Sequence, residues 1–567
     1  MKRVIKTRDF DGEQIDVIYR ETIPLKENDY FGGWGYYGEI NQRIYEAAPG
    51  IICEQDVPVK LRDGVTIYTD IYRPDTQEKV PVIIAWSFYG KRPHDFKPYH
   101  IPGVPDGTVS DMTKVEGPDP AFWCRNGYAI ANPDPRGIGN SEGDALLFGK
   151  QDGKDGYDFV EWIASQEWCN GNVGMSGNSM LAITQYFIAA EQPPHLKAIA
   201  PWEGSSDLLR EANFNDGVPC IGFVRFALMN LGGKNLVEDE AAMSEKYPLY
   251  NNYWADKSVD FDKITVPAYL AAGWSHIHLR GTVNAFEKMS SQNKWIRFHR
   301  EFEWPDYYNN KNLQDLKIFF DRYLKEIHNG WELTPRVRLD VMDSYELDYQ
   351  LERPEMEFPL ARTVYKKLYL NAGTGCIQDN IPESICHIEY DAAEGEGLFT
   401  IQFMEELEIT GHSKLKLWVE AIDNDDMDLF ITIRKLSARD EFMHTSVLGQ
   451  RHPGTWGNLR VSHRALAADH DNSIIPIHSH LKEEKLSPGE IVPIEIEIMP
   501  VSRIWHKGEK MQIRISGHYE RDPWFEPHSW DVCNKGKHVI YTGGIYDSYL
   551  QIPVIPPRIH TDTFVRR

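Results

Sequence analysis

Short apolar runs alternate with stretches of helical spacing between residues 80 and 299, and this alternation leaves few folds open to the chain. The runs at 80–86 (VPVIIAW) and 129–134 (AIANPD) have the length and composition of buried strands, whereas 155–166 (DGYDFVEWIASQ) has helical spacing. The same order continues with strands at NVGMS, AIAPW, VPAYLAAGW and KWIRFH and with helices at SMLAITQYFIAAEQ and LQDLKIFFDRYLKE. Strands that alternate with helices predict a mostly parallel sheet covered by helices on both faces.

The sequence around this core indicates two further segments. Residues 1–50 are polar and aromatic and are expected to form an N-terminal arm on the main body, followed by a hairpin around Asp63-Gly64. Residues 203–262 interrupt the alternation of strands and helices with polar and aromatic stretches and helical pieces such as FVRFALMNL and EDEAAMSEKY. An insertion of this kind between two strands is typical of a cap over the active face of the sheet.

From Pro335 onward, short alternating strands replace the earlier pattern. Turns rich in Gly, Pro and Asp separate the runs RVRLDVM, KKLYLNA, KLKLWVEA, DLFITIRKL, IVPIEIEIM and MQIRISG. This arrangement is the signature of an antiparallel sandwich of the jelly-roll type. We therefore predict an α/β domain over residues 51–332, which includes the cap, and an all-β domain over residues 333–567.

The bulk composition excludes several classes of function. The chain has 567 residues and a formal net charge of −24 at pH 7, and so acidic a surface repels phosphate backbones and anionic lipids. Nucleic-acid and membrane partners are therefore not expected. Seven cysteines occur without a CxxC pair, and the sequence contains neither a recognisable secretory signal nor an apolar run of membrane-spanning length. These features favour free thiols and a cytoplasmic location.

Two serines compete for the role of a nucleophile in the stretch 171–185, GNVGMSGNSMLAITQ. Ser176 ends the expected strand, whereas Ser179 follows Gly177-Asn178 at the junction between that strand and the next helix. A nucleophile elbow places its serine at such a junction among small residues, and the helix N-terminus offers free N–H groups to a developing oxyanion. The position favours Ser179, although an N-cap serine has the same local pattern.

Longer stretches on both sides of this serine carry a resemblance to a known family. They are VPVIIAWSFYGK (80–91), CRNGYAIANPDPRGIGNSEG (124–143), KDGYDFVEWIASQEWCNGNVGMSGNS (154–179), APWEGSSDLLRE (200–211) and the run 463–497. Together they resemble the CocE/NonD hydrolases, the cocaine-esterase-like relatives of the Xaa-Pro dipeptidyl peptidases. The resemblance covers most of the chain. It implies an α/β-hydrolase domain, a helical cap and a C-terminal jelly roll, which agrees with the patterns of the residues.

By position, the resemblance implies a nucleophile at Ser179 and an oxyanion hole formed by the Tyr89 hydroxyl and the backbone N–H of Met180. The elbow of the family usually has tyrosine and glycine at the positions of Met180 and Ala182, and both replacements keep the turn feasible. A lone tyrosine after a strand is more often structural, but its surrounding motif favours the functional interpretation.

The acid and the base depart from the family pattern. The acid usually follows the pattern Gly-Trp-x-Asp, in which His276 occupies the aspartate position, and the usual position of the basic histidine falls near Phe302. In a first interpretation the two loops have exchanged roles, so that His276 or His278 is the base and Glu303 is the acid. Such an exchange is chemically allowed, because a triad is defined by geometry and roles and not by sequence order.

Two other interpretations remain open. In the second, His299 is the base and Glu303 or Asp306 orients it, although a buried structural histidine at this strand is at least as common. In the third, the triad is lost and the chain is a catalytically degenerate member of the family that acts as a binding protein. The presence of Ser179 and Tyr89 favours the first two.

We therefore expect a serine hydrolase of the esterase or dipeptidyl-peptidase type, which cleaves an ester or amide bond of a small molecule or a short peptide through an acyl-enzyme. No cofactor is expected. His276 and His278, with His299 or Glu303, also match a metal-ligand set, but histidine pairs of this spacing are often fortuitous, and no metal is expected. The sandwich is open to two roles, formation of a homo-oligomer or closure over the cleft.

Overall fold

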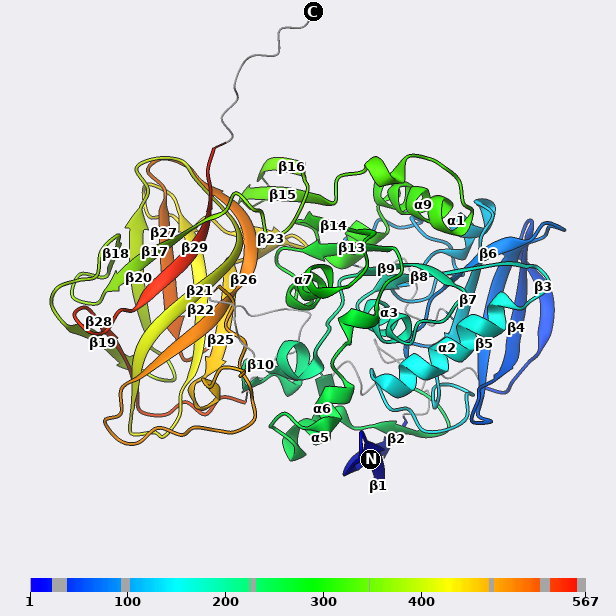
Figure 1. The fold of residues 1–567 in the computed structure, drawn as a ribbon, viewed down its shortest axis with the longest axis horizontal. Coiled ribbons are helices and arrows are strands. Elements are labelled where there is room, and N and C mark those ends of the chain that lie inside the picture. The colour runs from blue at the N-terminus through cyan, green and yellow to red at the C-terminus, as the bar shows by residue number, and fades with distance from the viewer. Residues whose placement is uncertain are drawn as a thin grey trace, which may run out of the picture.

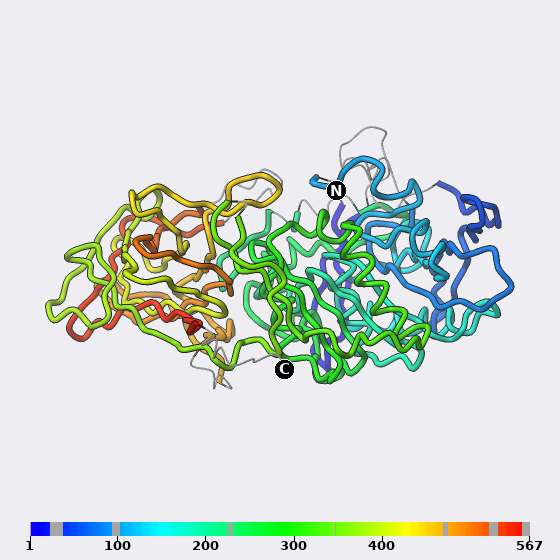
Figure 2. The backbone as a smooth tube through the Cα atoms, turned by 90° about the horizontal axis from the view of Figure 1, so that it is seen from above, coloured from blue at the N-terminus to red at the C-terminus, as the bar shows by residue number. Residues whose placement is uncertain are grey.

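Two bodies lie side by side along the long axis of the molecule in the computed structural model (Figure 1). The structure describes residues 2–22, 38–92, 102–222, 224–225, 231–345, 347–468, 474–520 and 531–557. One body is an α/β domain and the other is an all-β sandwich, and Figure 2 shows the elongated outline that they form together. The predicted fold class is confirmed.

The α/β body is built on one mixed sheet with the strand order β3-β4-β5-β7-β6-β8-β9-β13-β14-β15-β16. Neighbouring strands run parallel from β7 to β15 and antiparallel at both ends, as predicted for a mostly parallel sheet. β4 and β5 form the hairpin predicted around Asp63-Gly64. The strands are β3 Arg43–Ala48, β4 Ile51–Lys60, β5 Thr66–Pro74, β6 Val80–Ile84, β7 Ala129–Asp134, β8 Cys169–Asn178, β9 Leu196–Trp202, β13 Ala268–Gly273, β14 Lys294–His299, β15 Val337–Ser344 and β16 Leu347–Glu355.

Helices cover both faces of this sheet, because the inner strands are apolar on both sides. Every residue of β6 and of β13 is buried, which explains why the sequence shows them as continuous apolar runs. Val82 and Ile84 pack with α2, α3 and α7 in one hydrophobic cluster, whereas Ile83 packs with α1 and α9 in another. The helices are α1 Pro120–Arg125, α2 Lys150–Ala164, α3 Met180–Ala190, α7 Leu279–Lys288 and α9 Asn310–Leu324.

The insertion at 203–262 consists of short elements. They are a π-helical turn Leu209–Asn213, β10 Phe214–Asn215, β11 Val218–Pro219, β12 Leu236–Glu238, α5 Glu240–Lys246, α6 Asn252–Asp256 and a 3-10 turn Phe261–Lys263. α5 confirms the helix predicted in EDEAAMSEKY, whereas the helix predicted over 223–231 falls largely outside the described residues. The N-terminal strands β1 Arg3–Phe10 and β2 Glu13–Glu21 form a hairpin, and β2 pairs with β12. The start of the chain therefore contributes to the cap.

The sheet of the α/β body continues past the predicted boundary at 332/333. β15 pairs parallel with β14 from Val337 to Leu339 and meets the sandwich strand β26 at Met342. The run 336–342, which the sequence assigns to the sandwich, therefore belongs mainly to the α/β sheet. A strand of a parallel sheet and a strand of a sandwich both consist of short apolar runs, so composition alone does not separate them.

Two sheets then form the sandwich. One contains β17, β18, β19, β21, β26, β28 and β29, and the other contains β20, β22, β25 and β27. Their bounds are β17 Val364–Asn371, β18 Cys376–Gln378, β19 Cys386–Asp391, β20 Glu396–Gln402, β21 Leu407–Ile422, β22 Asp428–Leu436, β25 Thr455–Arg460, β26 Val492–Trp505, β27 Lys510–Ser516, β28 Lys537–Thr542 and β29 Tyr549–Ile555.

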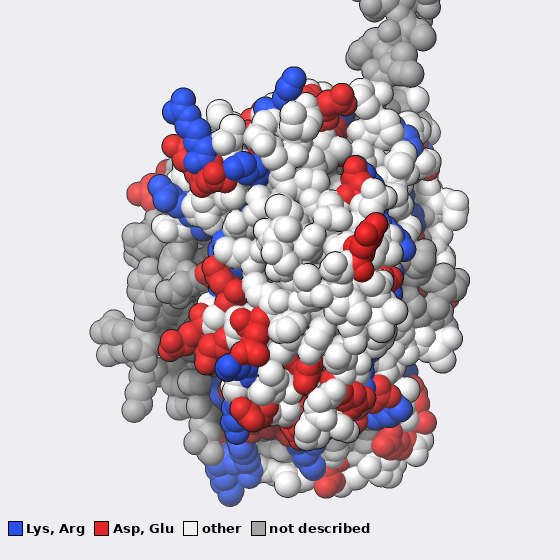
Figure 3. Space-filling model, turned by 90° about the vertical axis from the view of Figure 1, so that its left-hand side faces the viewer, with Lys and Arg blue, Asp and Glu red and all other residues white. Residues whose placement is uncertain are grey.

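The surface and the cysteines give a few further facts. Figure 3 shows the outer end of the sandwich, where acidic and basic side chains lie around a broad uncharged centre. All seven cysteines are free thiols. Among the residues that the structure describes, no helix is long and apolar enough to cross a membrane.

Candidate active site

Ser179 occupies a sharp turn between β8 and α3, at the carboxyl edge of the parallel sheet. Its backbone has φ 51° and ψ −116°, which is a strained conformation for any residue other than glycine. Small neighbours make the turn possible, because a Cβ on Gly177 would lie 2.4 Å from Leu181 and a Cβ on Gly204 would lie 2.9 Å from Ala182. The local geometry is that of a nucleophile elbow.

The second serine of the stretch has a different environment. Ser176 is buried, and its Oγ lies 2.8 Å from the hydroxyl of Tyr307. The backbone N–H of Ser179 donates to the carbonyl of Glu203 at 2.9 Å, which ties the elbow to the residue that follows β9. Ser176 therefore packs inside the sheet layer, whereas Ser179 lies at its edge.

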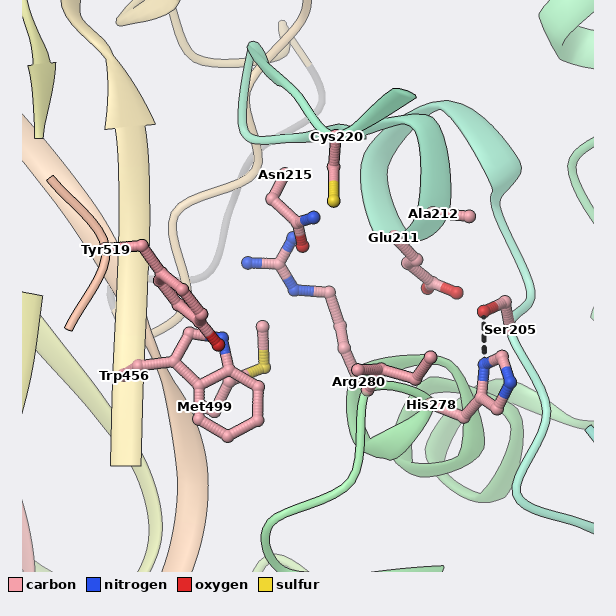
Figure 4. Close-up of a pocket in the computed structure, with 11 residues that line it drawn as sticks. Ser205, Glu211, Ala212, Asn215, Cys220, His278, Arg280, Trp456, Met499 and Tyr519 are labelled. Atoms are coloured by element: carbon pink, nitrogen blue, oxygen red, sulfur yellow. Dashed lines mark hydrogen bonds between the residues drawn. The ribbon is translucent and has the colours of Figure 1, made fainter. Parts of the chain in front are cut away.

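His278 connects Ser179 with a third serine. Its Nε2 lies 3.0 Å from Ser179 Oγ, and its Nδ1 lies 2.8 Å from Ser205 Oγ, the bond drawn in Figure 4. Burial lowers the pKa of His278 well below its ordinary value, and the neighbouring His276 lowers it further. A neutral imidazole that donates Nδ1–H to Ser205 presents the lone pair of Nε2 to the hydroxyl of Ser179.

His276 lies in a separate buried network. Its Nδ1 is 3.4 Å from Glu203 Oε2, and its Nε2 is 3.6 Å from Glu303 Oε1. The backbone N–H of His278 donates to His276 Nδ1 at 3.3 Å. His276 therefore contacts the backbone of the loop that carries His278, and it has buried carboxylates on both sides.

His299, the last residue of β14, extends this network. Its Nε2 lies 3.0 Å from Glu203 Oε1 and 3.5 Å from Asp306 Oδ2. Burial acts to lower the pKa of His299, but the carboxylates of Asp306 and Glu203 outweigh it and raise the pKa. Arg297 closes the network with a two-pronged ion pair to Asp306 at 2.7 and 2.5 Å. Of the three histidines predicted from the sequence, His278 is the one whose ring nitrogen lies beside Ser179.

Tyr89 contacts the side chain of Ser179, and Met180 directly follows Ser179 in the elbow. Burial raises the pKa of Tyr89 well above its ordinary value, Glu116 and Glu303 raise it further, and a hydrogen bond with Ser179 acts in the opposite direction. The hydroxyl therefore keeps its proton and can donate it in a hydrogen bond. Met180 is the first residue of α3, where the backbone N–H has no partner within the helix.

A cavity lies beside His278 where three parts of the chain meet (Figure 4). Arg280, the second residue of α7, extends into its centre and pairs with Asp216 at 2.5 Å and with Glu497 at 2.9 Å. The cap lines it with Glu211, Ala212, Asn215 and Cys220, and the sandwich lines it with Trp456, Met499 and Tyr519. The sandwich therefore forms one wall of a cavity that reaches the ring of His278.

Sequence reasoning missed three buried residues of this site, namely Glu203, Ser205 and Glu116. A signal for Glu203 exists, because a carboxylate directly after a parallel strand lies at the edge where α/β proteins gather their functional groups. Ser205 and Glu116 have no comparable signal. Burial, followed by the charge of Glu303, raises the pKa of Glu116 well above its ordinary value.

Comparisons with known proteins agree with this architecture. The family described as X-Pro dipeptidyl-peptidase (S15 family) matches residues 63–232, and the X-Pro dipeptidyl-peptidase C-terminal non-catalytic domain matches residues 329–551. A CocE/NonD family hydrolase from Staphylococcus aureus is 36% identical, with a TM-score of 0.85 over 89% of this chain and 94% of that chain.

Two more distant relatives are similar over different lengths. Cocaine esterase from Rhodococcus sp. (strain MB1 Bresler) is 27% identical over 380 residues, which is 56% of this chain and 62% of the esterase, so the match spans less than two thirds of that relative. An aminopeptidase from a marine sediment archaeon, Thaumarchaeota archaeon, is 15% identical with a TM-score of 0.66 over 95% of this chain and 99% of that chain. At this identity the second match shows a shared fold.

The strand–serine–helix elbow, the inserted cap and the second, all-β domain define an α/β-hydrolase with a C-terminal β-sandwich. The chain belongs to the CocE/NonD family of hydrolases. Its relatives are esterases and X-Pro-peptidase-like hydrolases, and the resemblance seen in the sequence is confirmed.

Proposed function

We propose that this chain is a serine hydrolase that cleaves an ester or amide bond through an acyl-enzyme on Ser179. The observation that carries the proposal is the 3.0 Å distance between Ser179 Oγ and His278 Nε2 at a strained elbow. The depressed pKa of His278, caused first by burial and then by His276, supports it, because a neutral imidazole can accept the serine proton.

The reaction has two halves. In the first, Ser179 Oγ attacks the carbonyl carbon while His278 Nε2 takes the hydroxyl proton, and the Tyr89 hydroxyl and the Met180 N–H donate to the oxyanion that forms. His278 then returns the proton to the leaving oxygen or nitrogen as its bond to the acyl carbon breaks. In the second half, water attacks the acyl carbon while His278 Nε2 takes its proton. The proton then passes to Ser179 Oγ as the bond between the acyl carbon and Oγ breaks, and the acid product leaves.

Ser205 orients the base in this proposal. A family member of the usual pattern has a carboxylate in the acid role, whereas the 2.8 Å contact of His278 Nδ1 is with a serine hydroxyl. We therefore propose that the base is His278, on the loop that usually carries the acid. Glu303, the acid of that interpretation, has an ion-pair distance of 3.6 Å to His276, so we assign it to the network behind the base.

The cavity favours a small substrate. Its walls come from α7, the cap and the sandwich, and Trp456, Met499 and Tyr519 offer a mainly apolar side. With a volume of about 50 Å³, the cavity suits a small acyl or leaving group of an ester or amide. Of the two roles open to the sandwich, this arrangement favours closure over the cleft.

A fluorophosphonate probe tests the proposal directly. The wild-type protein should be labelled covalently at neutral pH, and Ser179→Ala should abolish the label. Ser176→Ala is the matched control, because it removes the neighbouring hydroxyl and should keep the label. Absence of labelling in the folded wild-type protein would instead favour the catalytically degenerate binding protein, and labelling that persists in Ser179→Ala would assign the nucleophile elsewhere.

A further inference from the structure

Asp216, His478 and His480 come together where the cap meets the sandwich. Each residue offers one ligand atom, and these atoms lie within 4.8 Å of one another. The three side chains are 4%, 1% and 2% exposed. Asp216 occupies the turn between β10 and β11, and the two histidines belong to the segment that precedes β26. None of the three was singled out from the sequence.

The hydrogen bonds of His478 leave a lone pair directed at a carboxylate. Its Nε2 lies 3.0 Å from the carbonyl oxygen of Glu495, which only accepts, so Nε2 carries the proton. In the neutral ring Nδ1 then has a lone pair, and it faces Asp216 Oδ1 at 3.4 Å. Two acceptors at this distance repel each other unless a positive charge lies between them. A bound cation would supply that charge.

His480 contributes a second imidazole to the same place. Its Nδ1 lies 3.0 Å from His463 Nδ1, so one of the two rings donates and the other accepts. Within the described part of the chain, no hydrogen-bond partner reaches the buried Nε2 of His480. Burying a polar nitrogen without a partner is unfavourable, so an additional ligand at this ring would stabilise it.

Neighbouring residues contact the three groups and restrict their positions. Arg280 contacts the other oxygen of Asp216 at 2.5 Å and Glu497 at 2.9 Å, so one guanidinium lies between two carboxylates. Arg280 therefore neutralises only one of these two carboxylates. Metal ligands are usually held in place by contacts with the residues around them. Here Arg280 contacts the carboxylate of Asp216, and the carbonyl of Glu495 fixes the tautomer of His478.

We propose that Asp216, His478 and His480 bind one divalent transition-metal ion of the zinc class, which fastens the cap to the sandwich. Two imidazoles and one carboxylate are typical ligands of Zn²⁺, Co²⁺ or Ni²⁺. With metal–ligand distances of about 2.0–2.2 Å, ligand atoms lie about 3.3–3.6 Å apart, so the 3.4 Å between His478 Nδ1 and Asp216 Oδ1 already fits. The ligand atom of His480, at most 4.8 Å from the other two, completes the set by a small movement. Arg280 links this site to the cavity beside His278, so the metal would fix the wall of the substrate cavity that the cap provides.

Metal content and a spectroscopic titration test the site without reference to hydrolysis. The full-length protein is stripped with a chelator, equilibrated with Zn²⁺ and desalted, and the retained metal is measured by mass spectrometry. About one Zn²⁺ per chain should remain, and Co²⁺ should give the visible absorption of a site with nitrogen ligands. A wild-type protein that retains no metal overturns the proposal.

Variants separate this site from adventitious binding. His478→Asn, His480→Asn and Asp216→Asn should each weaken Zn²⁺ binding by about tenfold or more, judged from the effect of losing even an outer contact. His538→Asn is the matched control, because His538 is a buried histidine of the sandwich outside the cluster. Circular dichroism and gel filtration check that each variant is folded. Binding that is unchanged in all three folded variants, or equally lost in the control, overturns the proposal.

Discussion

Replacing Ser205 by alanine is the sharpest test of how His278 is held. In the proposed mechanism the Nδ1–H of His278 donates to Ser205 Oγ at 2.8 Å, and both residues are buried. The substitution removes that acceptor and keeps the ring, the nucleophile and the oxyanion donors. It therefore isolates the orientation and stabilisation of the base.

The expected loss can be worked out from the change of charge on the ring. A hydrogen bond between neutral groups contributes about 0.5–1.5 kcal/mol, and one to a charged group contributes about 1.5–3 kcal/mol. His278 is neutral in the ground state and becomes an imidazolium in the transition state, so the bond to Ser205 is stronger there by about 1–2 kcal/mol. Each 1.36 kcal/mol is tenfold in rate, so kcat should fall about 5- to 30-fold.

The assay is hydrolysis of a p-nitrophenyl ester with kcat and KM measured separately. Ser206→Ala is the matched control, because its Oγ donates to Glu211 at 2.9 Å, and it should leave kcat within about twofold of wild type. Thermal unfolding of both variants checks that neither effect comes from loss of the fold. Unchanged kcat in Ser205→Ala would refute the role of Ser205. If Glu203→Gln then abolished turnover, the carboxylate network would be the group that activates the base.

Three other perturbations give independent checks. Burial, and then His276, hold the pKa of His278 well below its ordinary value of about 6.5, so the base stays neutral as the pH falls. A profile of kcat/KM should therefore be level from about pH 8 down through 6.5 and decline only below that, and a decline centred above 6.5 would contradict the assignment. Tyr89→Phe removes one donor to the oxyanion and should lower kcat about 10²–10³-fold with the fold intact, whereas a loss below about threefold would remove Tyr89 from the oxyanion hole. Asp306→Ala leaves the buried Arg297 without its two-pronged partner and should lower the free energy of unfolding by about 3–5 kcal/mol in a urea titration, and a change below about 1 kcal/mol would show that Arg297 finds other compensation.

Much of the fold was predictable because its signals are local. The predicted bounds of two parallel strands, 129–134 and 294–299, coincide with β7 and β14, since each is a short run that stands out between helical stretches of the alternating pattern. The predicted place of the elbow at Ser179 has the same cause, because a strand, a glycine and a helix start must be adjacent in sequence. The pairing of β15 with β14 was not predictable, since it is a contact over about 40 residues that composition does not reveal.

The partner of Ser179 was not predictable in the same way. His276, His278 and His299 all lie at the carboxyl ends of the neighbouring strands β13 and β14, so topology brings all three to one edge of the sheet. The turn after Gly273 decides which ring reaches Ser179. His276 lies beside Glu203, whereas His278, two residues later, lies beside the nucleophile. Sequence patterns give the spacing of residues along the chain, whereas the contact with Ser179 depends on where a single side chain lies in space.

In the proposed mechanism a serine stands where a triad has its carboxylate, and this separates two tasks that the acid of a triad performs together. An acid fixes the tautomer of the histidine and also stabilises the imidazolium by its charge. Ser205 can perform the first task, since its oxygen accepts from Nδ1, but it carries no charge for the second. The carboxylates of Glu203 and Glu303 lie one histidine further away, on either side of His276. If these carboxylates stabilise the imidazolium through space, neutralising Glu203 should lower kcat and preserve the orientation of His278. Loss of Ser205 should instead change the orientation of His278 and leave the charge of the carboxylates in place.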